Sequence, residues 1–149
     1  TVQYVNGYFR AFPGVELTAS MVSNYVKKGI IGHPIKKKYT REQLAGLIYI
    51  VVSKTVLSME NIDTLFKMQR QHYSAAQAYD YFCEEVENCL PYVFGLTHTI
   101  RDLAADAGEE KLLLRSTIIA AVNKMFLDCA FAVMHQEQAL WPDILADLA

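Results

Sequence analysis

The segment from Leu17 to Arg41 is the part of this sequence whose residue types could bind a polyanion. It holds no acidic residue and six basic ones. The basic residues are Lys27, Lys28, Lys36, Lys37, Lys38 and Arg41. A surface that contacts phosphates gains from each cation and loses from each carboxylate, so the missing acids matter as much as the lysines. The segment therefore predicts contact with a phosphate-bearing partner.

The first part of this segment has the pattern of an amphipathic helix over 19–28, with one polar and one apolar face. The polar face holds Ser20, Ser23, Asn24 and Lys27. The apolar face holds Met21, Val22, Tyr25 and Val26. An Asn side chain can contact adenine through two hydrogen bonds, and Ser can contact bases or phosphates, so the polar face suits the major groove of DNA. The alternative is an ordinary solvated face.

A small β-hairpin is expected after this helix. Gly29 suits the helix end, and Ile30-Ile31 and Ile35–Tyr39 have the pattern of two short strands around Gly32-His33-Pro34. The lysines at 36–38 would then form a basic wing over 30–39 that contacts the phosphate backbone. The alternative is a lysine-rich edge strand that guards against aggregation.

Three helix starts share one capping signature. Thr18, Thr40 and Ser58 each follow an apolar residue and precede another apolar residue four positions later. Gln43 adds a capping box to the second start. The signature predicts helices at about 19–28, 41–55 and 59–70. A helix, a basic hairpin and further helices form the outline of a winged helix-turn-helix.

The same residues resemble a known family. The run Val22–Ile30 resembles the end of the recognition helix in MerR-type regulators. Lys38–Leu44 is similar to the exit from the wing in that family, and Leu57–Ile62 is similar to its next helix start. The resemblance covers about residues 15–70. It is closest to a bacterial domain-of-unknown-function family with a MerR-like winged helix.

This resemblance implies DNA binding by the predicted helix and wing. Two residues depart from the MerR pattern: Ser23 stands where an Arg is usual, and Asn24 where a Tyr is usual. These departures predict an unusual DNA site or weaker binding. The expected DNA-binding residues are Ser20, Ser23, Asn24, Lys27, Lys28, Lys36, Lys37, Lys38, Tyr39 and Arg41.

Charge divides the chain of 149 residues, whose net charge is −2, into two unlike parts. Residues 20–75 carry nine basic and three acidic residues, whereas residues 76–149 carry four basic and twelve acidic ones. The division predicts a winged helix-turn-helix DNA-binding domain over 1–72 and an acidic helical domain for dimerisation or effector binding over 73–149. The fold class expected is mainly α, with one small β-hairpin and an acidic α-helical bundle.

Besides a short helix that begins at Trp141-Pro142, three further helices are expected in the acidic part, over 74–90, 93–107 and 109–136. The last is apolar on most faces, which predicts burial in a bundle or in a subunit interface. Its stretch 112–134 is the best candidate for a homodimer interface. A dimer would place two recognition helices about one DNA turn apart.

Other functional classes lack their motifs. The longest apolar run, Leu44–Val52, is shorter than the roughly 20 residues of a membrane span. Three cysteines and no visible export signal favour the cytoplasm. No pair of Cys or His residues shares a helix face at metal-ligand spacing, and no phosphate loop or catalytic motif is present. We therefore expect neither a metal, a cofactor, an enzymatic activity nor a membrane partner.

An aromatic cluster at the start of the acidic part has two interpretations. It is either core packing or a pocket for an unknown small effector. The cluster consists of Tyr73, Tyr79, Tyr81, Phe82, Tyr92 and Phe94. The favoured function is a cytoplasmic transcriptional regulator that binds double-stranded DNA. The alternatives are a helical protein–protein adaptor whose winged helix does not bind DNA, and a one-component small-molecule sensor.

Overall fold

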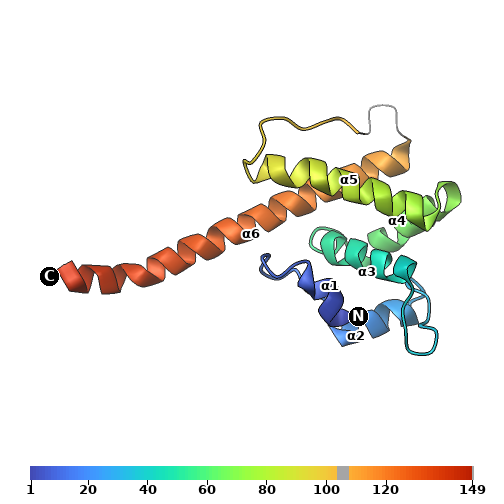
Figure 1. The fold of residues 1–149 in the computed structure, drawn as a ribbon, viewed down its shortest axis with the longest axis horizontal. Helices are drawn as coiled ribbons and strands as arrows, with labels where there is room; N and C mark the ends of the chain where they lie inside the picture. Colours follow the sequence, from blue (N-terminus) through green and yellow to red (C-terminus); the bar gives the residue numbers. More distant parts are fainter. Residues whose placement is uncertain (104–107, 149) are drawn as a thin grey trace.

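The structure is a computed structural model that describes residues 1–103 and 108–148, with side chains as far as Gln136 (Figure 1). The described residues form helices and no strand. The mainly α fold is therefore confirmed. The helices are α1 (Val2–Gly7), α2 (Ala19–Lys27), α3 (Arg41–Ser53), α4 (Met59–His72), α5 (Ala75–Val93) and α6 (Glu109–Leu148).

Side-chain caps begin α2, α3 and α4 where the sequence predicts them. The Oγ1 atom of Thr18 accepts from the backbone N–H of Met21, and Thr40 forms the expected capping box with Gln43. Ser58 caps α4 in the same way. These oxygens pair backbone donors that lack a partner in the first turn of a helix. Polar signals along the chain thus determine where three helices begin.

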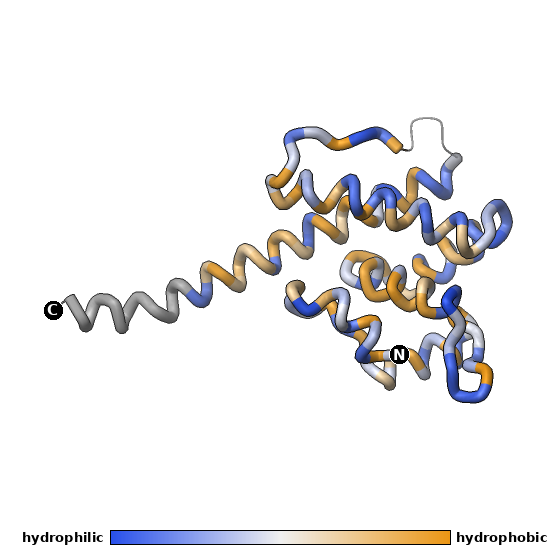
Figure 2. The backbone as a smooth tube through the Cα atoms, in the orientation of Figure 1, coloured by the Kyte–Doolittle hydropathy of each residue, from blue (hydrophilic) through white to orange (hydrophobic). Residues whose placement is uncertain are grey.

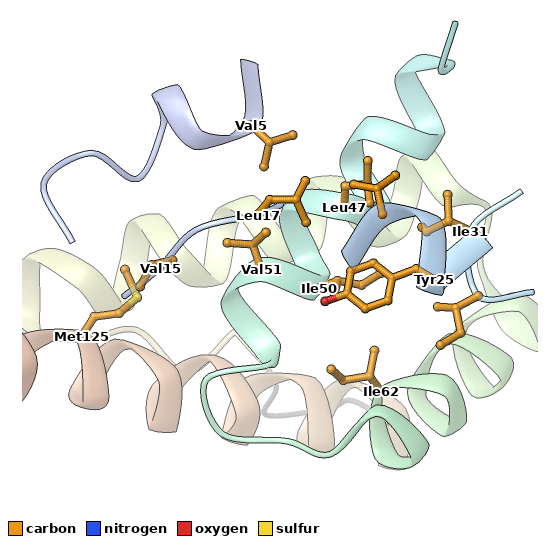
Figure 3. Packing of buried hydrophobic residues seen from close by; sticks show 12 residues of the cluster. Val5, Val15, Leu17, Tyr25, Ile31, Leu47, Ile50, Val51, Ile62 and Met125 are labelled. Carbon is orange, nitrogen blue, oxygen red and sulfur yellow. The ribbon is translucent and has the colours of Figure 1, made fainter. Parts of the chain in front are cut away.

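In the first hydrophobic core, residues of α1, α2 and α4 pack against α3 (Figure 3). Leu47, Ile50 and Val51 of α3 are fully buried there. Val22 and Tyr25 of α2 are buried against the same core. The apolar face predicted for this helix therefore points inward, and its polar face is left outside.

The second core lies between α5, α6 and the end of α3. Phe82 and Cys89 of α5 pack with Ile118 and Val122 of α6, and Val52 of α3 joins them. Met125 of α6 reaches the first core. The two parts expected from the charge pattern therefore share their interior.

The helix expected over 93–107 is wrong as far as the structure describes it. α5 continues past Pro91 to Val93, and Gly95 then turns the chain with a φ of 77°. The segment up to residue 103 is not helical, and residues 104–107 lie outside the described residues. Asn88 holds the returning segment because its amide nitrogen donates to the Arg101 carbonyl (2.7 Å) and its amide oxygen accepts from the Arg101 N–H (2.9 Å). This side chain replaces the backbone pairing that a helix would have supplied.

A buried carboxylate lies on α5. Glu85 is 1% exposed, and its Oε1 atom accepts a hydrogen bond of 2.7 Å from the Tyr81 hydroxyl. Its other oxygen has no hydrogen-bond partner in the described part of the chain. Burial and this hydrogen bond raise the pKa of Tyr81. The Tyr81 hydroxyl therefore keeps its proton and donates it in a hydrogen bond to the buried Glu85 side chain.

Replacing that donor should destabilise the fold. Tyr81→Phe leaves Glu85 without its hydrogen bond, and a buried polar group without a partner costs about 1–3 kcal/mol. We expect urea unfolding to show a loss of this size. Tyr92→Phe, at an exposed position of the same helix, is the control and should change little. Equal effects of the two changes would contradict the role of Tyr81.

Candidate nucleic-acid interface

The polar face of α2 is exposed. Tyr25 and Val22 face the first core, and the side chains on the opposite face lie in solvent. Lys28, the residue that ends α2, is also exposed. The exposed polar residues of the helix are Ser20, Ser23, Asn24 and Lys27. The face is small and polar and carries no carboxylate.

The expected hairpin is replaced by a tight turn, which we call the lysine turn (Ile35–Lys38). Ile35 and Lys38 form a single bridge, in which each backbone N–H donates to the other residue's carbonyl at 2.9 Å. Lys36 and Lys37 between them have positive φ values of 49° and 63°. Positive φ values at both central residues are the mark of a two-residue type I′ turn. The chain reverses at these two lysines.

The predicted strands Ile30-Ile31 and Ile35–Tyr39, with their turn at Gly32-His33-Pro34, are therefore wrong. The structure has one bridge and no strand in the residues it describes. The backbone groups of the first predicted strand have other partners: the N–H groups of Ile30 and Ile31 donate to the Tyr25 carbonyl, and the Ile30 carbonyl accepts from Arg70. In the predicted turn, the Gln43 amide nitrogen donates to the carbonyls of Gly32 and His33, each at 3.1 Å. This pairing leaves no ladder between the two segments.

The base of the loop is fixed to the core. Ile30 and Ile31 are buried, and their backbone N–H groups donate to the Tyr25 carbonyl at 3.0 and 3.3 Å. The Arg70 guanidinium of α4 donates to the Ile30 carbonyl at 3.1 Å and lies 5.5 Å from the ring centroid of Phe66. The lysine turn is thus an exposed tip on an anchored base.

The structure places nine of the ten predicted residues on the exposed surface. Tyr39 is the exception, because it is half-buried and packs against the first core. Arg41 is exposed at the first position of α3. Figure 1 shows the lysine turn and α2 at the same end of the molecule, on the side of α3 away from α5. We call the lysine turn and the exposed face of α2 together the basic surface.

The lysines of the basic surface differ from other cations of the chain. Three salt bridges occur among the described residues, and the basic surface takes part in none. Lys67 of α4 pairs with Asp63 at 2.8 Å. Lys54, which follows α3, donates to the Glu16 carbonyl, and its partial burial lowers its pKa. The charges of the basic surface therefore stay available for an external anion.

Sequence reasoning missed two anchoring residues. Gln43 was expected only to complete a capping box, but its amide also holds the loop carbonyls. Arg70 gave no signal, because its partner Ile30 is forty residues away. No group of three His, Cys, Asp or Glu side chains within 1–103 and 108–136 is arranged to hold a metal ion.

Comparison with known proteins gives one match. A family model described as "Domain of unknown function (DUF1836)" matches residues 1–82. The match contains α1 to α4 and the first turns of α5, so it includes the whole basic surface. No curated protein and no solved structure matches the chain.

The lysine turn should become more stable with residues that prefer its conformation. Lys36→Asn/Lys37→Gly supplies the pair most favoured in type I′ turns, and we expect thermal unfolding to show a gain of about 1 kcal/mol. Lys36→Ala/Lys37→Ala removes the same charges without favouring positive φ, so it should give no gain. If the alanine pair stabilises equally, charge repulsion rather than backbone conformation determines the effect.

Proposed function

We propose that this chain, which belongs to the family described as Domain of unknown function (DUF1836), is a cytoplasmic transcriptional regulator that binds double-stranded DNA. In this proposal residues 1–72 act as a MerR-like winged helix-turn-helix, with the lysine turn as a reduced wing. α2 enters the major groove, and the lysine turn contacts the phosphate backbone. The observation that carries the proposal is the exposed, acid-free basic surface.

The chemistry of the two elements favours this division of labour. Lysine is a flexible point charge that binds phosphate well but reads bases poorly, which suits the lysine turn. Ser23 and Asn24 are short polar residues on an exposed helix face, which suits close approach to base edges. The anchored loop base supports this reading, since a tip held by Gln43 loses little freedom on binding.

The proposal includes a homodimer formed through α6. This helix projects from the body, and hydrophobic residues recur along it (Figure 2). Phe131 and Met134, two of its large apolar residues, are 53% and 50% exposed. A second copy of the same helix could cover them, and two-fold symmetry would pair two basic surfaces for one DNA site.

A membrane is the competing environment for α6. Over Glu109–Gln136 the helix is long and apolar enough to cross a bilayer by length and composition alone. Lys124 and Asp128 form a salt bridge of 2.6 Å on this stretch, and Asn123 adjoins it. Charged groups inside a bilayer are costly, so these residues favour a protein partner in water.

A helical adaptor is the second candidate. The exposed apolar residues of α6 favour a protein partner, and in an adaptor that partner would be a different chain. Such a protein should tolerate the loss of the lysines in the lysine turn, whereas a DNA-binding protein should not.

DNA binding is tested by fluorescence anisotropy with a labelled 30-base-pair duplex of random sequence at 50 and 200 mM salt. We expect binding that weakens about 100-fold over this range if about four phosphates are contacted. Lys36→Asn/Lys37→Gly keeps the turn but removes two cations, so it should weaken binding at least about tenfold. The Lys36/Lys37/Lys38→Glu triple variant, with folding confirmed, should not bind.

The matched control is Lys67→Asn/Arg101→Asn. It lowers the net charge by the same amount as the asparagine–glycine pair, but at exposed residues outside both the basic surface and α6. Binding close to that of the unaltered chain is expected. No binding of the unaltered chain at 50 mM salt, or equal losses in the two double variants, would refute the proposal.

Dimerisation is tested by analytical ultracentrifugation. The unaltered chain should sediment as a dimer, and Phe131→Lys/Met134→Lys should give a folded monomer, because four charges would meet across a two-fold interface. Leu96→Lys, at a residue that is 80% exposed outside α6, should remain dimeric. A monomeric unaltered chain at micromolar concentration would remove the dimer from the proposal.

A further inference from the structure

A second feature lies between α3, α4, α5 and α6. A cavity of about 100 Å³ is enclosed by four helices and is partly open to solvent. Its walls come from α3, α4, the start of α5 and the start of α6. Most of the lining is apolar, and its central residues are Ala45, Tyr49, Phe66, Ala78, Phe82 and Leu114.

The rings in the wall are arranged as aromatic contacts. Tyr49 lies edge-on to Phe66, with centroids 5.2 Å apart, and edge-on to Phe82 at 5.6 Å. Tyr79 stacks on Phe82 at 6.4 Å. Such rings offer both edges and faces to a further ring, and aromatic pairs gain free energy beyond the area they bury. The wall therefore favours an aromatic occupant over an aliphatic one of equal size.

The volume and polarity of the cavity limit what fits. An enclosed apolar cavity of about 150 Å³ holds one benzene molecule. This cavity is smaller but partly open, so it fits no more than a single ring whose outer edge and short substituent lie in the opening. An ionised group in an apolar site loses its hydration without full compensation. The lining holds two carboxylates, Glu42 and Glu110, and one cation, Lys111, so its charged groups do not add up to a site for an anion.

We propose that this cavity is a binding site for a small neutral molecule with a single aromatic ring. The site deepens the sensor alternative of the sequence analysis, because Tyr79 and Phe82 of the expected aromatic cluster line it, together with Tyr49 and Phe66, which sequence alone did not join to them. Binding at this site does not depend on DNA. A molecule bound in this cavity would contact both the start of α6 and α3. α3 is also the helix whose Gln43 holds the loop before the lysine turn.

Phenol is the probe, and the full-length chain is studied without DNA. We expect phenol to raise the melting temperature in a concentration-dependent way, because a ligand that binds only the folded state stabilises it. Cyclohexanol, a non-aromatic ring of similar size, should bind about fivefold more weakly. Benzoate, a charged single ring, should cause no comparable rise.

Two variants of α5 locate the site. Ala78→Leu places a larger side chain in the cavity and should weaken phenol binding at least tenfold. Ala76→Leu makes the same change at an exposed position two residues away and should bind phenol normally. Methyl NMR of the unaltered chain adds a measurement that needs no variant. The methyl signals of Leu65 and Leu114 should shift with phenol, and those of exposed Leu96 should not.

The outcomes separate clearly. Selective shifts at Leu65 and Leu114, with binding lost only in the Ala78 variant, support the site. If phenol leaves the melting temperature and these methyl signals unchanged, the proposal is wrong. Equal shifts at Leu96, or equal binding by both variants, also overturn it because the interaction is then non-specific. If Ala78→Leu does not fold, the NMR result alone decides.

Discussion

The burial of α3 is the constraint on which the rest of the structure depends. Its sequence from Leu44 to Val52 is apolar on almost every side, and such a helix must be covered on all faces. One side packs into the first core through Leu47, Ile50 and Val51, and the other contributes Val52 to the second core. α1 and α2 therefore cover one side of this helix, and α5 and α6 cover the other. α4 contributes to both, because Ile62 lies in the first core and Phe66 packs toward α5 and α6.

The start of α3 connects this buried helix to the basic surface. The Thr40–Gln43 capping box fixes where the helix begins, and the same Gln43 amide holds the loop before it. Ile30 and Ile31 bury the near end of that loop. The lysines can then remain exposed on a rigid base, since the apolar part of the loop already supplies the packing free energy. A charged tip and a buried base arise from one short segment.

The side of α3 that faces α5 and α6 is packed less completely than the side that faces α1 and α2. α5 and α6 cover it with aromatic residues whose edge-on contacts leave a cavity between the rings. The start of α6 closes this cavity, and the later turns of α6 extend beyond the body, where no described element covers Phe131 or Met134. The same helix thus forms part of the cavity wall at its start and exposes an apolar surface further along.

The sequence alone determined the local features. Hydroxyl residues at Thr18, Thr40 and Ser58 set three helix starts because a cap acts within one turn. The period of α2 set its inward and outward faces, so the exposure of Ser23 and Asn24 was predictable. The mainly helical class and the acid-free segment were equally readable. Tertiary structure decided the rest: the reversal at Lys36 and Lys37, the non-helical return after Gly95, and the wall of the cavity. The return after Gly95 and the cavity wall depend on side chains that meet from distant positions, Asn88 with Arg101 and Tyr49 with Phe82, and no local pattern encodes such contacts. The reversal is closed by backbone bonds between Ile35 and Lys38, and the residue type of its two lysines does not predict their positive φ.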